Sequence, residues 1–435
     1  MNNLQKKPMK MPSVSSLSRR GTRFLLGLLG AFLLGATLVH AEPYIVISGD
    51  LRGEIKPCGC AEEGDMGGLQ RRGTALSHWR SEHSDVMYLD LGNNFPEPSA
   101  QGKLKLDLIQ QALKLLKPAA ILPGPHEWNY GQATWDTSLP YLLSNAIDLP
   151  WPQVISQNVG GESREIWGYV TPDLLYQNEN DLPNVVPVSD ALIQQWQSQS
   201  QPGAKRMLLF RGTSVEADRF LQSGWFDRIL VGSTNDDELN QVTTFATETQ
   251  SLQMIPTKGQ GLYHGFSSSD QLDIRWLHLD TADWEPLTPL FTNYDQEVKQ
   301  LFLSGLKRMQ QLQQETRFVG AAACTTCHTQ AHQSWESSRH SHALATLTRV
   351  GKDFDPECLQ CHVVGFQKKG FLSNQLTPQL ANVQCENCHG SAQEHLKNPL
   401  NHPPLDARQA CVNCHVGSHS PSFNFSTYWP KIQHK

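Results

Sequence analysis

One five-residue pattern, C-x-x-C-H, occurs four times in the last quarter of the chain, at residues 324–328 (CTTCH), 358–362 (CLQCH), 385–389 (CENCH) and 411–415 (CVNCH). In each pentad, two thiols separated by two residues can reach the two vinyl groups of one porphyrin, and the adjacent histidine can bind its iron. The pattern therefore predicts four covalently bound c-type haems. The attaching cysteines would be Cys324, Cys327, Cys358, Cys361, Cys385, Cys388, Cys411 and Cys414. The proximal ligands would be His328, His362, His389 and His415.

Zinc is the alternative for paired cysteines, since a zinc ribbon also uses two C-x-x-C pairs. The eight thiols of the pentads would be enough for such sites. Zinc coordination, however, gives no reason for a histidine directly after every pair, and here all four pairs are followed by one. We therefore favour haem over zinc.

Histidines are concentrated in the same part of the chain, because 11 of the 17 lie within residues 321–435. Seven remain after the proximal ligands are assigned: His332, His340, His342, His395, His402, His419 and His434. An iron with two axial imidazoles is low-spin and closed to substrates, whereas an iron with one open position can bind small molecules. We expect three of the seven to be distal iron ligands, namely His340, His395 and His434. His332 and His402 are expected at the surface.

Residues around the pentads form longer motifs: W-x-x-S-x-H-x-x-A at residues 335–343, DPECLQCHVVGF at 355–366 and VQCENCHG at 383–390, with His395 downstream. Together they resemble the tetrahaem cytochrome c family of nitrifying bacteria, over residues 319–435. The resemblance implies a mostly helical, haem-packed domain that passes electrons between redox protein partners. It also implies that most irons are bis-histidine. One haem of the family's type member is five-coordinate, and the sequence leaves undecided whether this chain has such a haem and which one it would be. The resemblance assigns His340 and His395 as distal ligands, with His434 a looser match.

The N-terminal part has strand-length apolar runs that alternate with helical patterns. The runs lie at residues 44–47, 86–89, 207–210 and 228–231. Apolar spacing typical of a helix covers residues 104–117, just ahead of Pro118. This alternation predicts an α/β layered domain over residues 42–292. The polar segment 194–201 is predicted to be a loop.

An amphipathic segment follows the α/β part. Its apolar residues recur at helical spacing and share one face: Val298, Leu301, Phe302, Leu306, Met309 and Leu312. We predict that residues 293–318 form a connector helix, packing the α/β domain against a haem domain at residues 319–435.

Residues 1–41 have the order of a secretory signal peptide. Basic residues precede an apolar run from Phe24 to Val39, and a small-residue cleavage site ends at Ala41. We expect cleavage after Ala41 and export to the periplasm or the cell surface, with no membrane span in the mature chain, since no second apolar run is long enough. An uncleaved N-terminal anchor is the alternative. The formal net charge of -6, without a basic stripe, argues against nucleic acid as a partner. The sequence leaves open whether copies associate into a homo-oligomer.

A second set of motifs lies in the α/β part: GDLR at residues 49–52, GGLQRR at 67–72, DLGN at 90–93, GPHE at 124–127 and ILVGST at 229–234. Their order resembles the metallophosphoesterase domain of the 5′-nucleotidase superfamily. The resemblance implies the fold of that family, whose active members hold two metal ions for hydrolysis at these points.

Most metal ligands of that family are replaced in this sequence. The replaced positions are Arg52, Asn93, Pro125, Ser233 and Thr234, and the retained ones are Asp50, His126 and Glu127. Too few ligands remain for two metals, and an arginine inside the site would repel them. We therefore expect the fold to be kept and phosphoesterase activity to be lost.

Cys58 and Cys60 are the two cysteines outside the pentads. They can form a strained C-x-C disulfide, act as a redox-active dithiol or bind a soft metal, and we favour the disulfide. Four functions stay in view. An active phosphoesterase joined to cytochromes is argued against by the ligand losses, and an interaction module that docks the haem part onto a partner or into a filament is a weaker idea. An electron carrier is favoured by the pentads. A haem oxidoreductase, acting on a small nitrogen or sulfur compound at an open iron or at the Cys58/Cys60 pair, is the alternative, and no residue is assigned a catalytic role.

Overall fold

The structure is a computed structural model. It describes residues 42–57, 65–159, 161–175, 184–232, 244–246, 251–255, 257–269, 271–312, 315–401, 405–416, 419–420 and 422–434. The predicted signal peptide lies outside the described residues, as do Cys58, Cys60, Ser233, Thr234 and His402. Within the described ranges, no helix has the length and hydropathy needed to cross a membrane.

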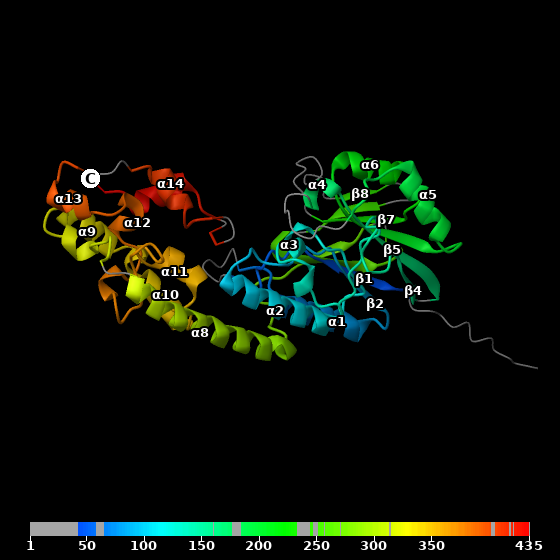
Figure 1. Ribbon diagram of the computed structural model, residues 1–435, viewed down its shortest axis with the longest axis horizontal. Helices are drawn as coiled ribbons and strands as arrows, with labels where there is room; N and C mark the ends of the chain where they lie inside the picture. Colours follow the sequence, from blue (N-terminus) through cyan, green and yellow to red (C-terminus); the bar gives the residue numbers. More distant parts are fainter. Residues whose placement is uncertain are drawn as a thin grey trace, which may run out of the picture. The chain divides into compact units, whose positions relative to one another are not determined.

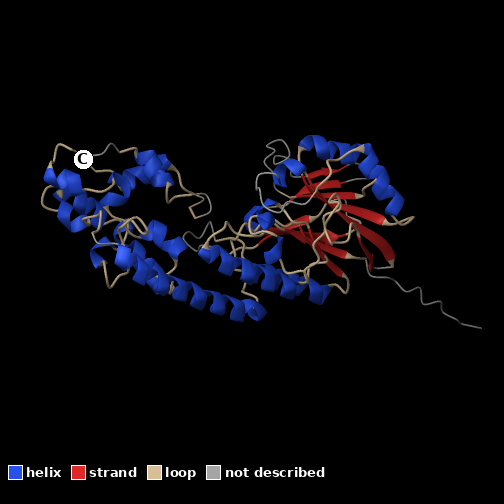
Figure 2. Ribbon diagram, viewed as in Figure 1, coloured by secondary structure: helices blue, strands red, loops and turns tan. Residues whose placement is uncertain are grey.

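The strands lie in the N-terminal part of the chain (Figures 1 and 2), where they form two β-sheets. The first sheet has the strand order β11-β10-β1-β2-β3. Its strands are β1 (Tyr44–Ser48), β2 (Val86–Asp90), β3 (Ala120–Ile121), β10 (Gly261–Phe266) and β11 (Asp273–Trp276). β1 runs parallel to β2, with Tyr44 opposite Val86, and antiparallel to β10. The apolar runs predicted at residues 44–47 and 86–89 are thus two neighbouring strands.

The second sheet has the order β4-β5-β6-β7-β9-β8. Its strands are β4 (Ile155–Val159), β5 (Glu162–Val170), β6 (Lys205–Arg211), β7 (Arg228–Val231), β8 (Thr244–Ala246) and β9 (Ser251–Met254). The inner strands β5, β6, β7 and β9 are parallel to one another. Buried parallel strands need apolar residues on both faces, which is why β6 and β7 appear in the sequence as continuous apolar runs.

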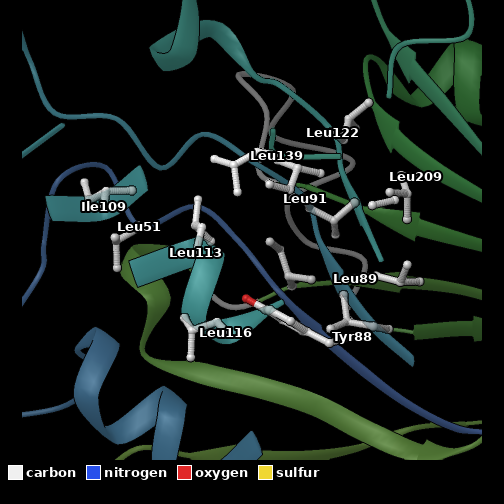
Figure 3. Close-up of a cluster of buried hydrophobic side chains, with 14 of the residues drawn as sticks. Leu51, Tyr88, Leu89, Leu91, Ile109, Leu113, Leu116, Leu122, Leu139 and Leu209 are labelled. Atoms are coloured by element: carbon white, nitrogen blue, oxygen red, sulfur yellow. The ribbon is translucent and has the colours of Figure 1, made fainter. Parts of the chain in front are cut away.

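The two sheets pack face to face through a shared core. Along β6, Met207 and Leu209 point into this core, whereas Leu208 and Phe210 point to the opposite face, as the two-residue period of a strand requires. Figure 3 shows Leu209 in the same buried cluster as Leu89 of β2 and Leu91, which directly follows that strand.

Helices cover the outer face of each sheet, giving four layers in the order α, β, β, α. The first sheet is covered by α1 (Leu69–Glu82) and α2 (Ala100–Leu116), and the second by α5 (Asp190–Gln199) and α6 (Ser214–Gln222). Two single-turn helices, α3 (Pro125–Trp128) and α4 (Pro172–Leu175), complete this part. The predicted α/β layered domain is confirmed.

The prediction of a loop at residues 194–201 is wrong, because most of this segment belongs to α5. Ser189 caps the helix, with its side chain accepting a hydrogen bond from the backbone N–H of Leu192. Trp196 is fully buried in the outer core of the second sheet. One buried tryptophan and two buried aliphatic residues hold this otherwise polar helix in place.

The long helix α8 (Thr288–Leu312) begins before residue 293, the start that the sequence predicts. Its first half contributes Phe291, Tyr294 and Val298 to the core of the α/β part, and Phe302 belongs to a separate small core in the C-terminal part. Residues 315–318 are not helical. The predicted end is therefore too late, and the side chain of Leu312 at the end of the helix is 71% exposed rather than buried.

The C-terminal part consists of short helices joined by turns, as predicted. They are α9 (Thr329–Glu336), α10 (Ala343–Arg349), α11 (Pro356–His362), α12 (Cys385–His389), α13 (Gln393–Lys397), α14 (Ala407–Val412) and α15 (Phe425–Tyr428). Between the described residues of this part, extended pairing is limited to one isolated bridge, Val363 to Ala381. Its apolar core is small and centred on α10 and α11.

Candidate haem ligands and a buried arginine centre

Each of the four pentads forms one helical turn. The second and third lie within α11 and α12. In the first and fourth, the backbone N–H of the histidine bonds to the carbonyl of the first cysteine, His328 to Cys324 and His415 to Cys411, both at 2.9 Å. A helical turn places positions i, i+3 and i+4 on one side. Both thiols and the imidazole of a pentad therefore face the same way, and the thiols of all eight cysteines are free.

Three of the four pentad histidines lie opposite a second imidazole from elsewhere in the chain. The ring pairs are His328 with His395 (centroids 5.9 Å apart), His415 with His340 (6.2 Å) and His389 with His434 (5.9 Å). A bond from a metal to an imidazole nitrogen is about 2 Å. Two such bonds, together with the distance from each bonded nitrogen to the centre of its ring, add up to a length similar to these centroid separations. Each of the three pairs therefore has room for an iron between its rings.

The state of these imidazoles also suits ligation. Burial lowers the pKa of His340, His389 and His415, and this favours the neutral form that binds a metal. The Nδ1 atom of His395 is buried and has no hydrogen-bond partner within the described part of the chain. That ring therefore has a nitrogen available for iron.

His362, in the second pentad, has a different environment. No other ring contacts it among the described residues, and its Nδ1 lies 2.7 Å from the carbonyl oxygen of Ala343. A carbonyl can only accept, so Nδ1 carries the proton and Nε2 is the nitrogen left for a metal. The same backbone bond fixes the orientation of the ring.

Among the described residues there are three further spare histidines, and none of them faces a pentad imidazole: His332, His342 and His419. The ring of His332 contacts Trp335, with centroids 5.2 Å apart, and the residue is half-buried rather than exposed as predicted. The tryptophan ring supplies the cover that the sequence did not reveal. His342 is exposed.

The pentads also contact one another. The thiols of Cys324 and Cys385 lie next to each other, which places the first pentad beside the third. The thiols of Cys361 and Cys414 also lie next to each other, which places the second pentad beside the fourth. The third and fourth are in contact through α12 and α14. The spatial order is therefore first, third, fourth, second.

In the N-terminal part, the retained residue Asp50 lies in a buried ionic cluster. Its side chain is fully buried, and Oδ1 accepts a hydrogen bond from Asn93 Nδ2 at 2.7 Å and lies 3.5 Å from Arg211 Nη1. Arg52 Nε is 3.2 Å from the other carboxylate oxygen. Asp50, Arg52 and Asn93 all have left-handed backbone angles, with φ between 48° and 59°. Such strain in non-glycine residues is typical of functional sites.

Arg211 is the residue of this centre that the sequence analysis does not identify. It ends β6 of the second sheet, is fully buried, and donates from Nη2 to the carbonyl of Leu91 at 2.7 Å, so it links the two sheets. Burial lowers its pKa, while the charge of Asp50 acts in the opposite direction. The signal for Arg211 in the sequence is a charged residue directly after a strand-length apolar run. The carboxyl ends of buried parallel strands are where α/β folds place their ligand-binding sites.

The other two retained residues, His126 and Glu127, are held by backbone groups. The Glu127 carboxylate accepts from the backbone N–H of Asn93, Asn94 and Gly124 at 2.7 to 2.8 Å, and burial raises its pKa to about 7. His126 Nδ1 lies 3.0 Å from the carbonyl of Phe95, and burial lowers the pKa of His126. Across the described ranges, no three His, Cys, Asp or Glu side chains come together to hold a metal ion.

The C-terminal part is similar to known cytochromes. Residues 323–390 match the family model for cytochrome c554 and c-prime. Over 97 residues the chain is 34% identical to cytochrome c-554 of Nitrosomonas europaea, an alignment that covers 19% of this chain and 41% of that protein. The chain thus spans less than half the length of this curated relative. The match supports a domain with covalently bound c-type haem.

Solved structures with a similar fold include a 5′-nucleotidase precursor from Thermus thermophilus, with a TM-score of 0.47, 16% identity and 59% of each chain covered. A calcineurin-like phosphoesterase from Bacillus subtilis gives 0.45 and 14%, over 59% of this chain and 97% of that one. The NAD nucleotidase of Haemophilus influenzae gives 0.44 and 15%, over 65% and 64%. The chain covers about three-fifths of the first of these structures. These likenesses say nothing of activity.

Proposed function

We propose that this chain is an exported electron-transfer protein whose residues 319–435 hold four covalently bound c-type haems. The observation that carries the proposal is the set of three imidazole pairs, each joining a pentad histidine to a spare histidine at a separation that suits an iron. Unrelated surface histidines have no reason to meet pentad histidines three times. Zinc in a ribbon would need thiols, not opposed imidazoles.

In this proposal two histidines would hold each of three haems, and one histidine would hold the fourth. The pairs would be His328 and His395, His389 and His434, and His415 and His340. His362 would be the sole axial ligand of the second haem, since no second ring contacts it among the described residues and Nδ1 is engaged by Ala343. Haem supplies reversible one-electron chemistry. The contacts between pentads would place the four haems in one continuous series, which suits passage of electrons between redox protein partners.

A haem oxidoreductase is the second candidate. It is favoured by the environment of His362, because an iron with one protein ligand can bind a small nitrogen or sulfur compound. The same site would then be the place of reaction, and the three other haems would deliver or remove electrons.

For the N-terminal part we propose a phosphoesterase-like domain, residues 42–292, that has lost hydrolysis. The guanidinium groups of Arg52 and Arg211 lie beside Asp50. At this position active relatives would need metal ions that polarise a phosphate. A fixed arginine supplies charge but no metal-bound water as nucleophile. Residues 293–318 would connect this domain to the haem domain, and residues 1–41 would direct export.

We expect four haems per chain, and haem colour that stays with the denatured protein after extraction with acidified acetone, because thioether bonds hold each porphyrin. The measurements are the pyridine haemochrome spectrum per mole of chain and the iron content. The ferric protein should show three low-spin irons and one high-spin iron. Zinc in place of iron, or colour lost to the solvent, would reject the proposal.

We also expect no phosphoesterase activity. The full-length, haem-loaded protein, supplied with Mn²⁺, should leave hydrolysis of a nitrophenyl phosphodiester at the buffer rate, and calorimetry should detect no binding of two Mn²⁺ per chain. An Asp50→Asn variant is the control for contaminating hydrolase. Hydrolysis by the wild type that disappears in this variant would contradict the expectation.

A further inference from the structure

A group of polar contacts joins two helices of the α/β part to the first turn of α11, the helix of the second pentad. From α2, Gln101 Nε2 donates to Asp355 Oδ1 at 2.8 Å, and Lys105 Nζ lies 2.7 Å from Glu357. From α8, Asp295 lies 2.5 Å from Lys352, which is also 3.9 Å from Asp355. The polar groups around Asp355 thus come from three segments of the chain.

Asp355 is the N-cap residue of α11, directly before its first turn. Its Oδ1 accepts the capping bond from the backbone N–H of Glu357 at 3.1 Å, so one carboxylate oxygen serves both the cap and Gln101. Gln101 and Asp355 are only 5% and 6% exposed. Gln101 also reaches the hydroxyl of Tyr294 on α8 at 3.0 Å. A buried amide with two such partners is costly to disturb, because each lost bond leaves a buried polar group unpaired.

Because α11 is short, the position of its first turn determines the position of its last residue. The helix spans only Pro356–His362 and contains Cys358, Cys361 and His362. Its far end is held by the bond from His362 Nδ1 to Ala343. Two helical turns cannot absorb a shift of the first turn without moving the imidazole at the last residue.

We infer that the α/β part acts as a positioning element for the second haem site, with Gln101 the positioning residue that acts through Asp355. The inference rests on the proposed function, in which residues 358–362 hold a haem with His362 as its one axial ligand. The α/β domain, which we propose has lost hydrolysis, would then have another role. It would fix the position of the one iron that is open to small molecules and would leave the three bis-histidine irons unaffected.

The test is Gln101→Leu in the full-length, haem-loaded protein. Leucine keeps most of the volume and removes both hydrogen bonds. We expect the high-spin ferric signal in electron paramagnetic resonance to change shape or split into more than one species, and the midpoint potential of that haem alone to shift. The three low-spin signals should stay as in the wild type.

Gln110→Leu is the matched control, because Gln110 lies on the same helix, is 6% exposed, and bonds to Thr134 and Asp136 within the α/β part. It should lower thermal stability and leave every haem signal unchanged. If Gln101→Leu does not accumulate, Lys105→Met removes a peripheral contact to the same turn and should give a smaller change at the same haem. A high-spin signal and potential that match the wild type in the variants at Gln101 and Lys105 would overturn the inference. A wild type without any high-spin iron would instead overturn the proposed ligation.

Discussion

Replacing His340, His395 or His434 with alanine is expected to turn one low-spin haem into a high-spin haem. Each of these rings lies about as far from a pentad imidazole as two iron–nitrogen bonds require. Alanine leaves the iron with one strong axial ligand, and an iron of this kind is high-spin. Each variant should therefore contain two high-spin irons per chain, against one in the wild type, as counted by electron paramagnetic resonance of the ferric protein.

The three variants should affect three different haems. His395→Ala should change the haem of His328, His434→Ala that of His389, and His340→Ala that of His415. His332→Ala is the control, because His332 is a spare histidine whose ring contacts Trp335 rather than a pentad histidine. A variant whose spectrum is unchanged would reject that pairing. A new high-spin signal in His332→Ala would move the ligand role to His332.

The haem-binding pentads could be predicted from the sequence because their chemistry is local. Attachment needs five consecutive residues, and these are visible in the sequence whatever the fold. The pairing of distal with proximal histidines could not be predicted, since His340 and His415 lie 75 positions apart and meet only through the tertiary structure. The distinct environment of His362 depends on a backbone carbonyl, which no sequence motif reports.

The α/β fold could be predicted where strands are buried on both faces, as at β1 and β7, because such strands are continuous apolar runs. The sequence does not predict α5, because the few apolar residues of this helix lie among glutamines and serines and their burial depends on the outer core of the second sheet. The role of Arg211 cannot be predicted from the sequence for a related reason. A single arginine at the end of a strand has no motif, and its role appears only when the two sheets bring it to Asp50.

Arg211→Met is expected to lower the free energy of unfolding of the α/β part by about 3–5 kcal/mol, the usual cost of breaking a buried ion pair. Arg211 and Asp50 are both fully buried. Methionine fills similar space but leaves the Asp50 carboxylate beside Arg52, whose side chain is 40% exposed and compensates a buried charge less well. The bond to the carbonyl of Leu91 is lost as well. The measurement is chemical denaturation of the full-length protein followed by tryptophan fluorescence.

Asp50→Asn removes the charge of the ion pair while keeping the shape of the site. Asparagine tolerates the left-handed backbone at this position, where φ is 54°. Alone it leaves Arg211 buried with less compensating charge and should also destabilise. The double variant removes both charges, so its loss of unfolding free energy should be smaller than the sum of the two single losses by about 0.5–3 kcal/mol.

Lys205→Met is the control, on the same strand as Arg211. It breaks an exposed pair with Asp227 and should lower the free energy of unfolding by less than about 1 kcal/mol. Strictly additive losses, or an Arg211→Met variant as stable as Lys205→Met, would show that the two sheets do not depend on this buried pair.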